Sequence, residues 1–351
     1  MKEKVIVKVI VMVIACVGAW LVCFGGYSPD VIKAMAQDRS RIIGETMGAK
    51  AREVLRVVDQ DGIPVTNARV YGSFWPGNAG RNYFLVDGVT DSDGEYVAEG
   101  MSKWKLTYQV TKTGYYMSNG TIDYLAATNI PVIINGKWQP YGGVRIVVMK
   151  KITNPCKLHA FPLSISGYQI PKFDEWLGFD FERTEWTLPY GKGRYADVLL
   201  RFSAMRKGLH DYRYVMEVSF TNNPYAGGYQ MTVDKSSELV TEYIADSNAA
   251  YQTEFSYVKE QSPGTKRHWD VLDGDSYIVF RTRTRVDEHG NLVGAHYGKI
   301  LGQWFSGKEY MTMSDGCFNP VENDVNIEDG GVLRNTLRNR NRKQGRDKVS
   351  P

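Results

Sequence analysis

Signature motifs of the common enzyme classes are missing from this 351-residue sequence. It contains no HExxH pair for zinc, no GxSxG nucleophile turn and no GxxxxGK[ST] loop for nucleotide phosphates. No GxGxxG stretch opens a helix that would bind a dinucleotide. The motifs therefore name no reaction, and catalysis has to be weighed against binding or structural functions from other features.

Cysteine and histidine, the usual ligands of transition metals, are scarce. The four cysteines and five histidines are scattered and form no CxxC pair, so no metal or other cofactor is expected. Cys16 and Cys23 lie in an apolar N-terminal run, which leaves Cys156 and Cys317 to bracket the second half of the chain. In an oxidising compartment this second pair is a disulfide candidate, and two free buried thiols are the alternative.

The net charge is small, at +4. Residues 330–351 hold seven Lys and Arg against one acid, a net +6, so the rest of the chain carries 4 − 6 = −2. A body of this charge is not expected to bind nucleic acid. The tail has too few apolar residues to build a core, and we expect residues 330–351 to form a basic disordered segment.

The N-terminus carries a long apolar run that is typical of an export signal. Three lysines precede residues 9–26, which contain no charge. The length of this run lies between that of a cleaved signal peptide and that of a spanning helix, so residues 1–36 are interpreted as a signal peptide or a signal anchor. Residues 37–51 are then a spacer. The rest is expected outside the cytoplasm, in the periplasm, at the cell surface or secreted, with residues 9–26 as its membrane contact.

Two Asp-Gly turns follow in a β-rich stretch. "VVDQDGIPVTNARVYG" and "GVTDSDGEYVAEG" each place such a turn between alternating apolar and polar residues. Gly62 and Gly94 allow the positive φ that these turns need. Since the sequence contains no EF-hand loop, four aspartates are interpreted as turn formers in preference to calcium ligands: Asp59, Asp61, Asp91 and Asp93.

The order of these elements resembles the carboxypeptidase regulatory-like domain. The matching pieces are Asp-Gly-Ile-Pro-Val at 61–65, Ala-Arg-Val at 68–70, Thr-Asp-Ser-Asp-Gly-Glu-Tyr at 90–96 and Lys-Thr-Gly-Tyr-Tyr at 112–116. The resemblance implies a transthyretin-type β-sandwich over residues 52–151. In that family the module often accompanies enzymes but carries no catalytic group itself. The connection over residues 73–88 is longer and more aromatic than is usual in the family.

Residues 156–329 form a second β-rich region in which we recognise no family. Runs such as "YRYVMEVSF" and "SYIVFRTRTRV" alternate with turn signals, and no long amphipathic helix competes with them. The predicted fold class is therefore all-β. An N-terminal apolar helix is followed by the transthyretin-like sandwich and then by a larger antiparallel β-sandwich or jelly roll.

Aromatic and acidic residues supply the candidate ligand-binding positions. Aromatic residues make up 12% of the chain, and exposed tryptophans would form a binding face. The candidates are Trp75, Trp176, Trp186, Asp180 and Glu182. The alternatives are a core position for each aromatic side chain and a charged surface segment for the acids.

These features favour an exported, cell-envelope-associated binding or structural protein, with glycans or envelope proteins as its partners. The alternative is a glycan-acting hydrolase or lyase with its site in the second β domain. That alternative depends on a cleft that joins some of five acids, because a pair of carboxylates beside aromatic platforms is what glycoside cleavage requires. The five are Asp174, Glu175, Asp180, Glu182 and Glu185.

Overall fold

The computed structural model is built almost entirely from β-strands, which confirms the all-β fold class. It describes residues 34–35, 39, 42–44, 46–75, 84–126, 133–161, 167–220, 225–270 and 275–330. The expected apolar helix at 9–26 and residues 331–351 of the expected basic tail lie outside this part. Within it, no helix combines the length and the apolar character needed to cross a membrane. The chain divides into two compact units, Met1–Lys150 and Lys151–Pro351.

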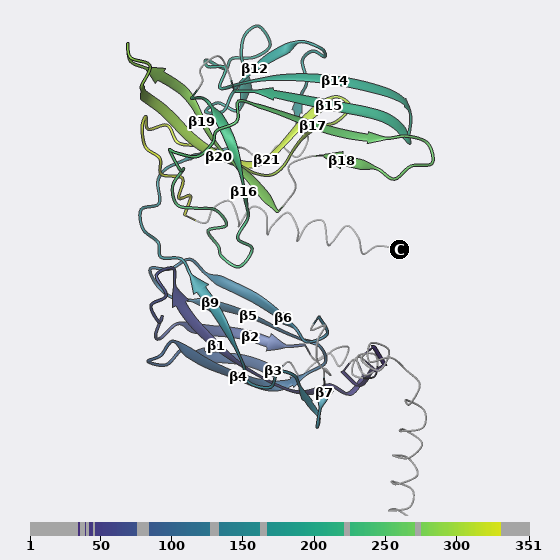
Figure 1. Cartoon of the computed structure of the whole chain (residues 1–351), viewed down its shortest axis with the longest axis vertical. Coiled ribbons are helices and arrows are strands. Elements are labelled where there is room, and N and C mark those ends of the chain that lie inside the picture. The colour runs from purple at the N-terminus through teal and green to yellow at the C-terminus, as the bar shows by residue number, and fades with distance from the viewer. Residues whose placement is uncertain are drawn as a thin grey trace, which may run out of the picture. The chain divides into compact units, whose positions relative to one another are not determined.

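The first unit contains two β-sheets that face each other across one core (Figure 1). Its strands are β1 (Ala49–Asp59), β2 (Arg69–Phe74), β3 (Phe84–Val89), β4 (Glu95–Ser102), β5 (Lys105–Thr111), β6 (Ser118–Asp123), β7 (Ile133–Ile134), β8 (Lys137–Trp138) and β9 (Gly143–Met149). In one sheet β1 pairs antiparallel with β4 and parallel with β8 and β9. The other sheet has the order β3-β2-β5-β6 and is antiparallel throughout.

Alternation along the strands builds the core of this first unit. Leu55 and Val57 from β1 meet Phe74 and Leu106 from the other sheet, and all four are fully buried. Each such side chain contributes about 1.5–3 kcal/mol of transfer free energy. Together with Trp138, which is also fully buried, they hold the two sheets together.

The Asp-Gly turns form as their sequences predict. Asp59 accepts hydrogen bonds through Oδ1 from the backbone amides of Asp61 and Ile63, each at 2.9 Å. Asp91 does the same in the second turn. Gly94 has a φ of 73°, and a Cβ there would lie 2.5 Å from the Val57 carbonyl oxygen, so only glycine fits. Asp59 and Asp91 therefore stabilise the backbone of their turns.

The second unit also contains two facing sheets (Figure 1). Its strands are β10 (His159–Ala160), β11 (Tyr168–Gln169), β12 (Trp176–Asp180), β13 (Glu185–Trp186), β14 (Val198–Gly208), β15 (Asp211–Ser219), β16 (Gly227–Thr232), β17 (Glu254–Gln261), β18 (His268–Asp270), β19 (Ser276–Val286), β20 (Leu292–Ser306) and β21 (Tyr310–Phe318). One sheet has the order β10-β21-β20-β19-β16, with β11 beside β21. The other has the order β13-β12-β14-β15-β17-β18. All of these pairings are antiparallel.

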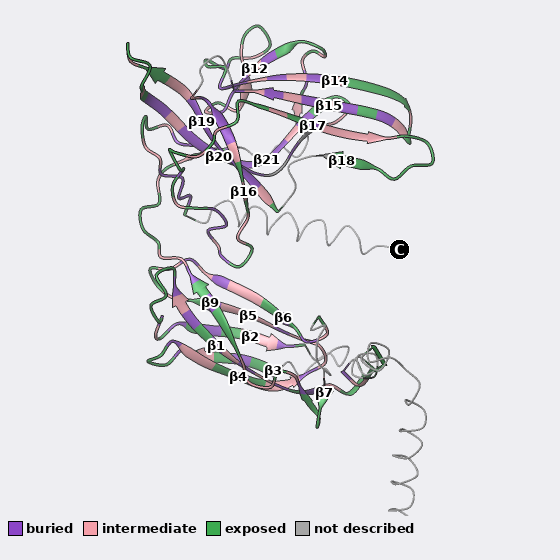
Figure 2. Ribbon diagram, in the orientation of Figure 1, coloured by how far each residue is buried: buried purple, intermediate pink, exposed green. Residues whose placement is uncertain are grey.

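The sheet that contains β19 is covered on both faces. Ile278 and Phe280 point into the core between the two sheets. On the opposite face Tyr277 and Leu301 pack in a further apolar cluster, which also contains Ile327 from the chain after β21. Six consecutive residues of β19 are buried as a result, and Figure 2 shows the strand largely in the buried colour. Segments outside the sheet thus form a third layer.

Segments near the two ends of the second unit are hydrogen-bonded to each other. Glu328 is buried and accepts hydrogen bonds from the Thr153 amide at 3.0 Å and from the Asn154 amide at 2.7 Å. The Thr153 hydroxyl also donates to this carboxylate, at 2.5 Å. Asn326 donates from its side chain to the Asn154 carbonyl oxygen at 2.7 Å. These bonds close the unit across a separation of up to 175 residues.

Candidate functional site

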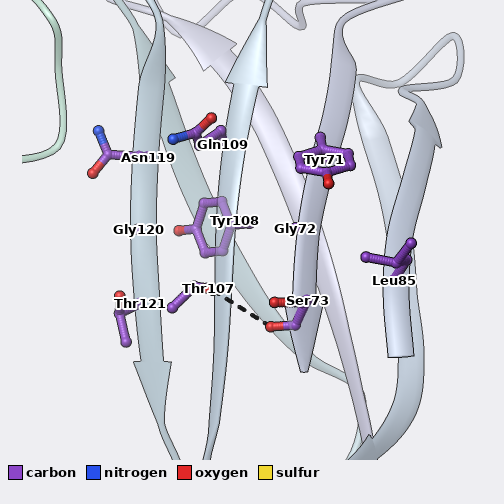
Figure 3. Close-up of a pocket in the computed structure, with 10 residues that line it drawn as sticks. All are labelled: Tyr71, Gly72, Ser73, Leu85, Thr107, Tyr108, Gln109, Asn119, Gly120 and Thr121. Carbon is purple, nitrogen blue, oxygen red and sulfur yellow. Dashed lines mark hydrogen bonds between the residues drawn. The ribbon is translucent and has the colours of Figure 1, made fainter. Parts of the chain in front are cut away.

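The outward face of the β3-β2-β5-β6 sheet carries a pocket of about 460 Å³ (Figure 3). The inward side chains of these strands, such as Val70 and Val110, belong to the core. Alternation therefore directs the intervening residues away from the core, and among the described residues they are exposed or half-buried. The lining of the pocket comes from all four strands.

Strand register arranges the outward side chains in two rows. The first row contains Leu85, Ser73, Thr107 and Thr121, each opposite the next. The second row contains Asp87, Tyr71, Gln109 and Asn119. Directly opposed residues in neighbouring strands have Cβ atoms about 4.5–5.5 Å apart, so the two rows form one continuous surface of hydroxyl, amide and aromatic groups.

Two glycines set the shape of the sheet beneath this surface. A Cβ at Gly72 would lie 2.2 Å from the Thr107 carbonyl oxygen, and one at Gly120 would lie 2.4 Å from the Tyr108 hydroxyl. The Tyr108 ring can therefore lie alongside β6, as Figure 3 shows. Tyr108 alternates with the outward Thr107 and Gln109 and packs against the core on the other side of the sheet, where burial raises the pKa of its hydroxyl.

The side chains that line the pocket carry no charge. Among the described residues that line it, none is acidic, basic or a histidine. Asp87, which lies next to Tyr71, is held by Arg69 through two hydrogen bonds of 3.2 Å. The Tyr71 side chain is 48% exposed and offers an aromatic surface, and the amides of Gln109 and Asn119 offer both donors and acceptors.

The predicted ligand residue Trp75 lies at one end of the same face. It continues the ladder of β2, because its amide donates to the Lys105 carbonyl oxygen at 2.8 Å. Alternation places it on the side of Tyr71 and Ser73. The ring is 37% exposed, and Lys105 Nζ lies 4.6 Å from its centroid. Ligand binding by Trp75 stays a prediction.

The predicted acids Asp180 and Glu182 come together in the second unit around one arginine. Arg283 donates to Asp180 at 3.3 Å, to Glu182 at 2.6 Å and to Asp197 at 2.8 Å. Asp180 also accepts from the backbone amide of Arg194 at 2.7 Å. Both carboxylates are thus engaged in a structural network, so the structure does not present them as an acid and base pair around a cleavable bond.

A β-bulge explains why Arg283 reaches these acids. The register of β19 with β20 shifts between Thr282 and Arg285, and Arg283 has a φ of 51°. Burial opposes the charge of Arg283, but its hydrogen bonds to Asp197 and Glu182 outweigh that effect and raise its pKa. Burial also raises the pKa of Asp197, whereas the bonds from Arg283 lower it. The network joins β12 of one sheet to β19 of the other.

The remaining predicted tryptophans have different surroundings. Trp186 is only 7% exposed, packs in the core between the sheets and donates from Nε1 to the Gln169 carbonyl oxygen at 2.8 Å. The alternative of a core position therefore describes Trp186, and its ring is not a surface platform. Trp176 is 44% exposed, with the Arg201 guanidinium 4.9 Å from its ring centroid. Ligand binding by Trp176 stays a prediction.

Cys156 and Cys317 are free thiols in the structure, and their pairing in an oxidising compartment stays a prediction. The Cys156 thiol lies 3.5 Å from the Asn326 carbonyl oxygen, and Cys317 packs in the apolar cluster with Leu301. Burial raises the pKa of Cys156 to about 11 and that of Cys317 to about 12. Both sulfurs are therefore protonated at neutral pH and react slowly.

Sequence reasoning did not single out the residues of the pocket on β2, β5 and β6. The signal that marks them is the polar half of the alternation in "RVYGSF", "KLTYQVT" and "SNGTID". Such a pattern is typical of any solvated sheet face, and only the register shows that Tyr71, Gln109 and Asn119 lie in one row.

No family model matches the chain, and no curated protein matches it. Among solved structures, a 3-chlorocatechol 1,2-dioxygenase from Rhodococcus opacus is 13% identical with a TM-score of 0.24, over 30% of this chain and 61% of that one. The Bacillus anthracis TIE protein is 16% identical with a TM-score of 0.22, over 51% of this chain and 30% of that one. A DUF3823 family protein from Parabacteroides merdae is 10% identical with a TM-score of 0.20, over 80% of this chain and 99% of that one.

These likenesses are too distant to assign a family or an activity. The TM-scores are all below 0.25, and the chain spans less than two-thirds of the dioxygenase's length. The β-sandwich architecture consequently rests on the strands and cores described above.

Proposed function

We propose that the protein is an exported, cell-envelope-associated binding protein that holds a glycan on the open face of its first sandwich. The observation that carries this proposal is the pocket on the β3-β2-β5-β6 sheet, where hydroxyls, amides and an exposed tyrosine share one surface. Its volume of about 460 Å³ falls within the range of roughly 300–1,000 Å³ for small-molecule sites.

The chemistry of the lining favours a neutral sugar as the ligand. A sugar hydroxyl both donates and accepts hydrogen bonds, and so do the side chains of Gln109, Asn119 and Thr121. The Tyr71 ring can pack against the apolar face of a pyranose ring. A charged ligand would lose hydration water without meeting an opposite charge in the lining, and this desolvation costs free energy.

The export and anchoring of the protein are part of the same proposal. Three lysines followed by the charge-free run at 9–26 support passage across a membrane. We further propose that the first sandwich is a carboxypeptidase regulatory-like module, on the matching pieces at 61–65, 68–70, 90–96 and 112–116. A binding role suits that resemblance, because the module carries no catalytic group.

The hydrolase or lyase alternative gains no support from Asp180 and Glu182. Asp180 and Glu182 share the Arg283 guanidinium, and Asp180 is 1% exposed. A general acid needs access to a leaving-group oxygen, which a buried and saturated carboxylate does not have.

Binding of the full chain in detergent micelles to a glycan array, followed by calorimetry with the best neutral glycan, tests the proposal. We expect Tyr71→Ala to weaken binding about tenfold, because the ring loses its stacking partner. Tyr190→Ala is the matched control, since Tyr190 is also exposed, at 41%, but lies in the second unit. The proposal is wrong if no glycan binds, or if the two variants lose affinity equally.

A further inference from the structure

A second pocket, of about 240 Å³, lies in the second unit between the far ends of β14, β15 and β17 and the turn that joins β20 to β21. The residues that matter for its chemistry are Arg206, Lys259, Arg267, Lys308, Tyr212 and Tyr214. Figure 1 shows β14, β15 and β17 side by side, with these ends reaching beyond β19 and β20.

Strand register places the tyrosines and cations on one face. Tyr212 lies opposite Arg206, and Tyr214 lies opposite Lys259. The two tyrosine rings are stacked with centroids 5.3 Å apart. On the far side Lys259 is paired in register with Trp269, and its Nζ lies 4.6 Å from the centroid of that ring. The stacked rings therefore form a rigid base beside the cations.

The lining of this pocket is strongly positive. Among the described residues that line it, four are cationic and none is acidic. Burial lowers the pKa of Lys259, and the charge of Arg267 lowers it further. The cations thus repel one another within a recess that excludes part of the water, and an anion would relieve this repulsion.

The nearest paired acids leave most of this charge in place. Glu309 contacts Lys308 at 2.8 Å at the exposed rim. Glu260 pairs with Arg213 at 2.6 Å, and alternation places both on the opposite face of the sheet from Tyr212 and Tyr214. Neither acid lines the pocket.

We propose that this pocket binds an oxyanion, namely the phosphate or sulfate group of a larger ligand. Arginine offers the bidentate geometry that tetrahedral oxyanions accept, and lysine adds a compact charge. The tyrosine hydroxyls add neutral donors. A pocket of about 240 Å³ is smaller than sites that enclose a drug-sized ligand, so it accommodates one anionic group while the rest of the ligand stays outside.

Calorimetric titration of the full chain with inorganic phosphate and, separately, with inorganic sulfate tests the proposal. The ionic strength is held constant with sodium chloride, because screening changes every surface interaction. We expect one anion per chain, and the tighter of the two identifies the group that the site selects.

Three substitutions locate the binding. Arg267→Gln and Lys308→Gln should each weaken binding about tenfold, the usual effect of removing one charge-assisted hydrogen bond. Lys308 is exposed, at 62% of its side chain, so its loss cannot unfold the unit. Arg213→Gln is the matched control, since it removes a cation from the other face of β15, and binding should stay within about twofold of wild type.

Two outcomes would overturn the proposal. The first is that neither phosphate nor sulfate binds at constant ionic strength. The second is that Arg213→Gln weakens binding as much as Arg267→Gln, since the attraction would then come from the overall charge of the surface and not from the pocket. The glycan site of the first unit is unaffected by either outcome.

Discussion

The open β3-β2-β5-β6 sheet of the first unit and the β19 sheet of the second unit differ in the exposure of the face that points away from the core between the sheets. Leu85 on the open face is 63% exposed, whereas Leu301 in the β19 sheet is fully buried. Both side chains point away from the core that lies between the two sheets of their unit. The difference arises because the chain around Val240 and Ile327 covers the β19 sheet. A sheet face stays exposed or becomes part of a second core according to which other segments of the chain cover it.

The ion pairs of the two units also differ in exposure. Arg69 and Asp87 pair on the open face with more than half of each side chain exposed. Arg283 pairs with carboxylates that are buried, and its own side chain is 14% exposed. Exposed pairs contribute little to stability, whereas the loss of one partner of a buried pair is costly.

The largest effect is expected from Arg283→Met. Removal of the guanidinium leaves Asp180 and Asp197 buried without their partner, and we expect unfolding free energy to fall by about 3–5 kcal/mol in urea denaturation. Arg285→Met is the control on the same strand, because its pair with Glu322 is exposed, and it should stay within about 1 kcal/mol of wild type. Equal losses in the two variants would contradict the difference between buried and exposed pairs.

The loss caused by Arg283→Met should depend on pH. Burial already raises the pKa of Asp197 above 3.8, and the arginine opposes that rise, so its removal raises the pKa further. A carboxyl with a raised pKa favours the folded state when protonated, and this contribution disappears as the pH rises through the folded pKa. The deficit relative to wild type should therefore be smaller at pH 5 than at pH 8, and a constant deficit would contradict this origin.

The next largest effect is expected when an outward-pointing leucine is replaced by alanine, and the same change is made on each of the two sheets. Leu301→Ala opens a cavity in the covered face and should cost about 2–5 kcal/mol, while Leu85→Ala on the open face should stay within about 0.5 kcal/mol of wild type. Urea denaturation of the two variants measures both values. A large loss from Leu85→Ala would mean that the open face is covered in solution, and it would also remove the basis of the glycan proposal.

The smallest effect concerns Glu53. Its side chain is fully buried, and Oε2 of its carboxylate lies 3.2 Å from Nε of Arg145. Burial raises the pKa of Glu53 above its ordinary value of 4.5, against the lowering by Arg145. Its contribution to stability is therefore fully present below that ordinary value and is lost as the pH rises through the folded pKa.

Glu53→Gln removes this titration. We expect the stability of wild type relative to the variant to fall as the pH rises above 4.5, in denaturation curves recorded in parallel at each pH. Val147→Ala, a core change in the same unit without a titrating group, should show a difference from wild type that does not change with pH. A pH-independent difference for Glu53→Gln would exclude the proposed raised pKa.

Local signals allowed the fold class and the turns to be predicted, because their causes lie within a few residues. Asp59 and Gly62 make a turn by contacts inside one short segment. The ion pair of Asp180 depends on a distant residue, since Arg283 lies 103 positions from Asp180 and reaches it through a bulge. The open face is likewise defined by register between strands, which alternation within a single strand does not specify.

The bonds that Thr153 and Asn154 donate to Glu328 form late in the synthesis of the chain. A ribosome makes the chain from its N-terminus, so the first sandwich has all of its strands once Met149 has emerged. The partner of Thr153 is made 175 residues later. Until Glu328 has been made, the carboxylate that binds the Thr153 and Asn154 amides is missing, and any factor that guards nascent chains has that interval in which to act.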